Sequence, residues 1–300
     1  MLGFPRMIRP PARAYVRNAT VSSSSLALLR EGIREVTSRQ RLIRYLVSAE
    51  MRRRGSDTLL GNLWWILDPL LQMVVYVIFV TIISKRPQAD YPLFIFAAIL
   101  PWKWFNTAVV DSTNSIVSRA GLIRQVAFPK LVLPFATVTS EVVGFAWGLI
   151  PLGVIMALYP GRLTLMVLWI PVIAAVQFVF TVGCATLVAA ANVYFRDLGN
   201  VSTHVLRLWF FLSPGLYSIS ALDSGQTFTA HEAVRFVAHL NPFAILFEAY
   251  RAVIYGTPDG GPPVPPDLVS LGLLLVASTI LTGLAIIVFK RLEPDFAKVL

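Results

Sequence analysis

Long apolar segments alternate with short polar ones along most of this chain. A helix that crosses a membrane needs about 20 mostly apolar residues. Six segments meet that requirement, over 62–84, 92–110, 131–159, 165–191, 205–222 and 268–289. The pattern therefore predicts an all-α integral membrane protein with six transmembrane helices.

A seventh stretch, 228–255, is only half apolar and is too polar to span. The residues that interrupt it are His231, Glu232, Arg235, His239, Asn241, Pro242, Glu248 and Arg251. We expect a re-entrant pair of short helices with its turn at Asn241-Pro242. Glu248 and Arg251, three residues apart on the second helix, can form an ion pair. The stretch 255–266 is rich in proline and glycine and predicts a stiff connector to the last span.

The segment 26–51 combines apolar and basic residues at helical spacing. Its apolar positions are Leu26, Leu29, Ile33, Val36, Leu42, Ile43, Leu46 and Val47. Its basic positions on other faces include Arg30, Arg34, Arg41 and Arg44. This pattern predicts an amphipathic helix in the membrane interface, either as an anchor for the first span or as a collar at a pore entrance. Residues 1–25 lack the apolar core of a signal peptide and are expected to form a flexible cytoplasmic tail.

Composition and charge agree with a membrane location and orient the chain. Hydrophobic residues make up 56% of the sequence and charged ones 14%, against about 25% charged in soluble domains, and the mean hydropathy is +0.68. With the amino end inside, 19 of the 26 basic residues fall in cytoplasmic segments and five outside. This positive-inside bias predicts cytoplasmic termini. Topology therefore accounts for the net charge of +10 without any nucleic-acid partner.

The motifs of the common catalytic and nucleotide sites are missing from the sequence. It contains no G-x-x-x-x-G-K-[ST], H-E-x-x-H or G-x-S-x-G, and no D-x-D pair. One cysteine, Cys184, and three histidines without ligand spacing argue against a metal site. Asp68 and Glu141 fall inside predicted spans, where a carboxylate is costly. A proton or ion site is one interpretation, but pairing with an arginine or a helix end is favoured, because no relay of carboxylates and histidines accompanies them.

Four local motifs follow one another in a characteristic order. The first joins Arg44-Tyr45 to LGNLWWILDPL at 60–70, and the second is LPWKWFN at 100–106 with LIRQVAFPK at 122–130 and Leu133-Pro134. The third is NVYFRDL at 192–198 with WFFLSPGLY at 209–217, and the fourth is Asn241-Pro242 with EAYR at 248–251. Together they resemble the permease subunits of type-2 ABC exporters, most closely those for O-antigen, teichoic acid, capsule and cell-wall galactan. The linker 51–59 departs from the family, because it lacks the usual basic and serine-containing run directly before Leu60-Gly61.

The resemblance implies a half-transporter in the bacterial inner or plasma membrane, with an interfacial helix and linker at 26–61 and a permease domain at 62–300. Two copies would form the pore for a lipid-linked glycan. Two copies of a separate subunit would bind ATP and magnesium, and this chain would hold no cofactor. The alternative is a type-2 permease for a small lipophilic compound or a lipid. A polytopic enzyme of lipid-linked sugar assembly would need a carboxylate or histidine cluster, and a secondary carrier would need two related halves; the sequence has neither.

The resemblance also suggests roles for particular residues. The segment 115–130 would be the coupling helix on the ATPase, with Arg119, Arg124 and Phe128 as contacts. Arg196-Asp197 on the next inside loop would contact the ATPase or order the loop itself. Asn241, Pro242, Glu248 and Arg251 would belong to an outer gate at 228–255.

Aromatic rings suit a path for sugars, since sugar C–H faces pack on them. The interfacial aromatic belt accounts by depth for Trp64, Trp65, Trp102 and Trp104. The deeper candidates for channel lining are Tyr76, Phe79, Phe211 and Tyr217.

Overall fold

The structure, a computed structural model, describes residues 24–55, 59–84, 90–125, 128–217, 241–257 and 260–300. All regular structure in these ranges is helical, which confirms the predicted all-α class. Nearly all of the predicted tail 1–25 and the first half of the predicted re-entrant pair lie outside the described residues. Within the described residues, five helical segments are long and apolar enough to cross a membrane. They are built on α3 (Trp64–Ser84), α4 (Tyr91–Asn114), α6 (Val132–Leu158), α7 (Ile170–Tyr194) and α12 (Leu268–Leu292).

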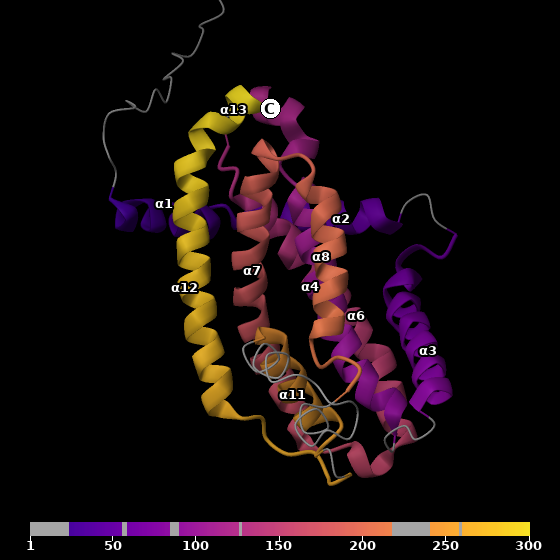
Figure 1. The fold of residues 1–300 in the computed structure, drawn as a ribbon. Helices are drawn as coiled ribbons and strands as arrows, with labels where there is room; N and C mark the ends of the chain where they lie inside the picture. Colours follow the sequence, from indigo (N-terminus) through magenta and orange to yellow (C-terminus); the bar gives the residue numbers. More distant parts are fainter. Residues whose placement is uncertain (1–23, 56–58, 85–89, 126–127, 218–240, 258–259) are drawn as a thin grey trace, which may run out of the picture.

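These five helices match five of the six predicted spans closely and run side by side along the long axis of the molecule (Figure 1). Short 3-10 turns extend or join several of them. The turns are η1 (Gly61–Leu63), η2 (Val117–Arg119), η3 (Pro160–Arg162), η4 (Leu165–Trp169) and η5 (Glu293–Asp295). The shorter helices include α5 (Ala120–Gln125), α11 (Pro242–Ile254) and α13 (Phe296–Val299).

The predicted fifth span, 205–222, corresponds to a shorter helix than expected. Helix α8 (Leu198–Leu212) begins before the predicted start and has 15 residues, fewer than the roughly 20 that cross a membrane. It ends where Ser213-Pro214-Gly215 follows, because proline cannot continue the backbone ladder and disfavours helix in the preceding residue. Residues 218–222 lie outside the described residues, so a sixth span stays a prediction.

The predicted amphipathic helix 26–51 is two helices, α1 (Ser25–Ser38) and α2 (Gln40–Gly55). They meet at Arg39, after two hydroxyl residues whose side chains bond to the helix backbone. Thr37 Oγ1 donates to the Ile33 carbonyl at 2.9 Å, and Ser38 Oγ donates to the Glu35 carbonyl at 3.3 Å. Such side-chain bonds compete with helix continuation.

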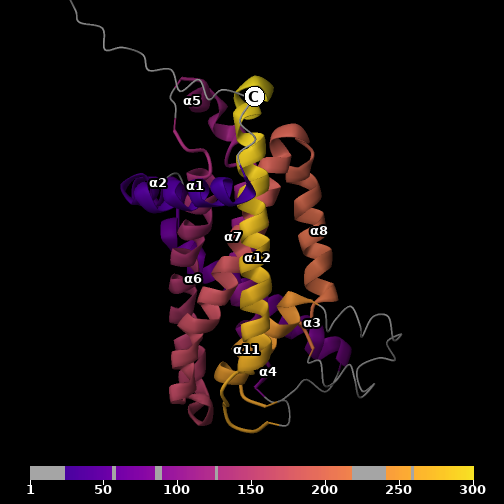
Figure 2. The ribbon, with the colours of Figure 1, turned by 90° about the vertical axis from the view of Figure 1, so that its left-hand side faces the viewer.

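Helices α1 and α2 lie across the long helices rather than along them (Figures 1 and 2). Helix α1 packs on α12 and α2 packs on α6. Each helix buries an apolar residue against the bundle, Leu28 on α1 and Ile43 on α2. This crossing arrangement suits helices that lie in the plane of a membrane interface.

Helix α4 is the centre of the bundle and α3 is its most loosely held span. Helix α4 packs on α3, α6, α7, α8 and α11, and most of its residues are buried. Helix α3 packs mainly on α4 and α6 and leaves a long apolar face exposed, including Leu71, Val75 and Ile82. In a membrane such a face can contact either lipid chains or another helix, since lipid chains are as apolar as leucine.

Helices α7 and α12 form the most extensive helix pair, and a glycine sets their separation. A Cβ atom placed on Gly183 would lie 2.9 Å from Thr282 Oγ1 and 3.2 Å from the Thr282 backbone nitrogen. Thr282 Oγ1 donates to the Val179 carbonyl at 2.7 Å, so it cannot move away freely. Small residues permit this close approach between membrane helices.

We predict that Gly183→Leu separates α7 from α12 and lowers the thermal stability of the purified protein in detergent. Overpacking of this kind costs about 1–3 kcal/mol. Gly153→Leu on α6 is the matched control, because nothing lies within 4 Å of a Cβ atom there. Equal stability of the two variants would contradict the proposed role of Gly183.

Candidate functional site

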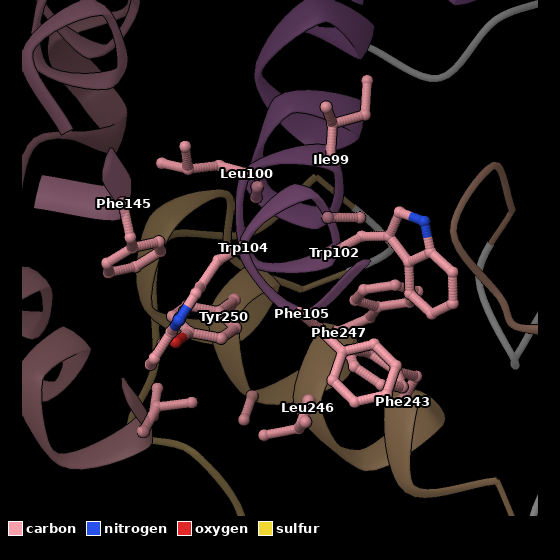
Figure 3. Close-up of a cluster of buried hydrophobic side chains, with 14 of the residues drawn as sticks. Ile99, Leu100, Trp102, Trp104, Phe105, Phe145, Phe243, Leu246, Phe247 and Tyr250 are labelled. Atoms are coloured by element: carbon pink, nitrogen blue, oxygen red, sulfur yellow. The ribbon is translucent and has the colours of Figure 1, made fainter. Parts of the chain in front are cut away.

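An aromatic cluster fills the middle of the bundle around Trp102 (Figure 3). The Trp102 ring lies 4.8 Å from Phe243, 5.3 Å from Phe210 and 5.6 Å from Phe105. These rings come from α4, α8 and α11 and so fasten three helices to one another. Edge-to-face and tilted contacts of this kind each add about 0.5–1.5 kcal/mol beyond burial.

The interfacial explanation of Trp102 and Trp104 is wrong. Trp102 is 4% exposed and Trp104 is 3% exposed, because other helices enclose α4. Depth along a helix indicated the belt, but lateral position in the bundle decides whether a ring meets lipid. Trp64 on α3, by contrast, is 42% exposed.

The four predicted channel residues occupy different surroundings. Tyr76 is half-buried, with its ring 5.6 Å from Phe210. Phe79 and Phe211 are 53% and 51% exposed on α3 and α8. Tyr217 is half-buried just after α8, and its carbonyl accepts a hydrogen bond from Arg251. The Tyr76–Phe210 contact joins α3 to α8, and Phe211 lies beside Phe210 on α8.

Asn241 begins α11 and joins it to the end of α8, while the predicted turn between two re-entrant helices stays a prediction. Its Oδ1 accepts hydrogen bonds from the Phe243 backbone N–H and from Trp209 Nε1, each at 3.0 Å. Its Nδ2 donates to Ser213 Oγ at 2.7 Å. Asparagine at the N-cap followed by Pro242 at the first helical position is a strong start signal for a helix.

Arg251 is buried and binds the chain segment that follows α8. Its guanidinium donates to the carbonyls of Pro214 at 2.6 Å and Tyr217 at 3.0 Å, and also to that of Gly215. The guanidinium carbon lies 3.8 Å from the centre of the Phe94 ring. The planar guanidinium can serve several carbonyls at once. The predicted ion pair with Glu248 stays a prediction.

Arg162, to which the sequence assigned no role, joins three connecting segments at the same end of the bundle. Its Nε donates to Asp90 Oδ2 at 3.1 Å, and its Nη1 donates to the carbonyls of Gly260, at 3.2 Å, and Gly261. It also stacks 4.7 Å from the Tyr255 ring centre. Asp90 has a left-handed φ of 51°, and this contact holds it in place. The proline- and glycine-rich connector is therefore tied to the bundle by an arginine.

A cavity of about 150 Å³, lined by both charged and apolar side chains, lies between α3, α4 and α6. Asp68 and Lys103 form an ion pair at its wall. Asp68 is therefore paired, as favoured, but with a lysine rather than with the expected arginine or helix end. Glu141, 6% exposed, lines the same cavity together with Trp64, Trp65 and Trp104. Asp68, Lys103 and Glu141 come from three helices, so no local pattern showed that they meet.

The predicted coupling segment 115–130 is not a single helix. It contains η2 and α5, and its backbone at 126–127 is not described. Arg119 points to helix α2, with Nη2 at 4.0 Å from Glu50 Oε2 and Nη1 donating to the Ser115 carbonyl at 3.1 Å. Phe128 is half-buried against an apolar cluster. The Arg124 side chain lies outside what the structure describes.

Arg196 and Asp197 lie at the turn between α7 and α8, where both are exposed. Phe195 beside them is 70% exposed. This turn therefore offers an exposed aromatic ring and two opposite charges together. Sequence reasoning selected the two charges but not the ring.

Comparison with known proteins identifies relatives over nearly the whole chain. The profile of the ABC-2 type transporter family matches residues 41–255. The chain is 34% identical over 269 residues to an O-antigen export system permease protein of Myxococcus xanthus, which covers 89% of this chain and 98% of that protein. It is 25% identical over 260 residues to a protein of the same description from Klebsiella pneumoniae, covering 86% of this chain and 95% of that one.

We predict that breaking the Asp68–Lys103 pair from either side destabilises the protein. Asp68→Asn and Lys103→Met should each cost up to about 1 kcal/mol, because ion pairs that are partly exposed, as this one is, contribute modestly. The double variant should recover part of that loss, and a double-mutant cycle from thermal unfolding in detergent measures the coupling. Strictly additive losses would show that the pair contributes nothing.

We also predict that Arg251→Lys loosens the segment 213–217, because one ammonium group cannot serve carbonyls on several sides. Protease sensitivity of this segment should rise, and thermal stability should fall. Arg207→Lys on the exposed face of α8 is the matched control and should change neither quantity. If Arg251→Lys behaves like that control, the guanidinium geometry is unimportant.

Proposed function

This chain belongs to the ABC-2 type transporter family, and we propose that it is the permease half of an exporter for a lipid-linked cell-surface polysaccharide. It is a multi-pass transporter membrane subunit of the bacterial inner membrane rather than an enzyme. The observation that carries the polysaccharide proposal is the likeness to O-antigen export permeases over nearly the full length of both chains.

The aromatic rings of α3 and α8 support a path for sugars. Tyr76 and Phe211 are linked through Phe210, and Phe79 and Phe211 each leave about half of their surface uncovered by this chain. Exposed rings can pack on sugar C–H faces without deep binding that would stall release. A second copy related by a two-fold axis would enclose them, since closed two-fold dimers are the commonest assembly of identical chains.

The energy for export would come from a separate ATP-binding subunit with its own magnesium, since this sequence has no phosphate-binding P-loop. That subunit would dock at the end of the bundle that carries α5 and the α7–α8 turn (Figure 2). Phe195, Arg196 and Asp197 offer it an exposed surface. Arg119, which reaches Glu50, would position the coupling segment on α2.

We predict that replacing Tyr76, Phe79, Phe211 and Tyr217 with alanine lowers polymer export while the protein still inserts and assembles. Each ring contributes about 1 kcal/mol of contact, so single variants should have mild effects and combined ones larger effects. Export is measured in vesicles that contain the permease and its ATPase, together with the amount of assembled protein.

The control is Leu273→Ala on α12, an exposed apolar position on the far side of the bundle from α3 (Figure 1). Export that falls only in parallel with assembled protein would remove these rings from the path. Stimulation of ATP hydrolysis by small lipophilic compounds but not by lipid-linked glycans would refute the polysaccharide proposal.

A further inference from the structure

A buried lysine at the end of α12 gathers three carboxylates. Lys290 is 4% exposed. Its Nζ lies 2.6 Å from Glu293 Oε2, 2.8 Å from Glu35 Oε1 and 3.3 Å from Glu31 Oε1. Glu31 and Glu35 belong to α1, so this ammonium group ties the interfacial helix to the last span. Arg291 adds a second link, from Nη2 to Ser25 Oγ at 2.9 Å.

The same glutamate, Glu293, also holds the end of the segment 115–130. Its second carboxylate oxygen, Oε1, accepts the backbone N–H of Lys130 at 3.0 Å. In return Lys130 Nζ donates to the Glu293 carbonyl at 3.0 Å. One side chain therefore binds Lys290 with one oxygen and Lys130 with the other.

An apolar cluster beside these charged side chains joins the end of α12 and helix α13 to α5 and α7. Phe289 and Phe296 are both fully buried, with ring centres 5.3 Å apart. They share a cluster with Ile123 of α5. Tyr194, at the end of α7, lies 6.2 Å from the Phe296 ring and donates to the Leu292 carbonyl at 3.4 Å. Residues 290–300, hereafter the carboxyl brace, thus contact α1, α5 and α7.

The charges of this cluster depend on one another. Burial is the main influence on Glu35 and raises its pKa, against the opposing hydrogen bond from Lys290. Burial likewise lowers the pKa of Lys130. Glu35 Oε2 is buried without a hydrogen-bond partner, so this carboxylate relies on its other oxygen and Lys290. Removing one member of such a network leaves the others desolvated and unmatched.

We propose that Glu293 is a positioning residue that links the segment 115–130 to the interfacial helix α1 through Lys290. The proposal rests on the proposed function, in which that segment receives force from the ATPase. A displacement of Lys130 would pull Glu293, and Glu293 would pull Lys290 and with it α1. Hydrogen-bond and salt-bridge networks of this kind can carry energetic coupling between distant sites.

The test measures movement and transport in the same complex. Spin labels are placed at the exposed positions Arg30 on α1 and Gln125 on α5, in the full chain with Cys184 replaced by alanine. The permease and its ATPase are reconstituted in lipid nanodiscs for distance measurement and in vesicles for export per ATP hydrolysed. The variants are Glu293→Ala, which removes both links, and Glu293→Gln, which weakens the link to Lys290 and retains an acceptor for Lys130.

The matched control is Asp295→Asn, two residues along the same brace. Asp295 pairs with exposed Lys298 at 2.8 Å. We expect a narrow distance distribution in the wild type that shifts when ATP binds. Glu293→Ala should broaden it, abolish the shift and lower export per ATP by roughly 2- to 30-fold, the range for residues that carry coupling. Glu293→Gln should be intermediate, and Asp295→Asn should match the wild type.

An unchanged distance distribution and export ratio in both Glu293 variants would overturn the proposal. So would a loss of export that only follows the amount of assembled protein, because Glu293 would then be a simple anchor. If Glu293→Ala fails to assemble, the distance distribution and the export per ATP of Glu293→Gln decide the proposal instead. If the wild type shows the shift on ATP binding and Glu293→Gln weakens it, but no polymer is exported, the link stands and the proposed function fails.

Discussion

A charged side chain inside an apolar bundle must find its hydrogen-bond partners within the protein, because lipid chains offer none. Two buried cations meet this requirement in different ways. Arg251 uses backbone carbonyls left free where α8 ends. Lys290 uses carboxylates from α1 and from the brace. Each cation fixes the relation between helices that apolar packing alone would leave free to slide, since dispersion contacts have no direction.

Hydrogen bonds and ion pairs hold the two ends of the helix bundle, and apolar packing holds its middle. Around Trp102 the bundle is held by packed aromatic rings from α4, α8 and α11. In the carboxyl brace, the two carboxylate oxygens of Glu293 accept hydrogen bonds from the Lys130 backbone N–H and from Lys290 Nζ. Helix α3 meets the aromatic arrangement only at its edge, through the Tyr76–Phe210 contact, and is also held by the Asp68–Lys103 pair and by apolar packing on α4 and α6. It is the least buried of the five candidate spans.

The sequence predicted the helices well and their lateral neighbours poorly, for a physical reason. The length of an apolar run is a local property, so the ends of α6, predicted as 131–159, were recovered within a residue. The break at Arg39 depends on side-chain bonds from Thr37 and Ser38, which compete weakly with the helix and leave no strong signal. Trp102 and Trp104 are buried because several helices surround α4. The apolar pattern along α4 does not show how many helices pack around it.

Long-range polar partners were beyond local patterns for the same reason. Lys290 binds Glu35 across a separation of 255 residues, and Arg251 binds the Phe94 carbonyl across 157. A basic residue in an apolar helix needs partners, but for both cations the sequence offers a local candidate that draws attention away from the distant ones. Glu248 lies three residues before Arg251, and Glu293 lies three residues after Lys290. That local pair supplies only one of three carboxylates, and the two from α1 are the ones that join separate parts of the molecule.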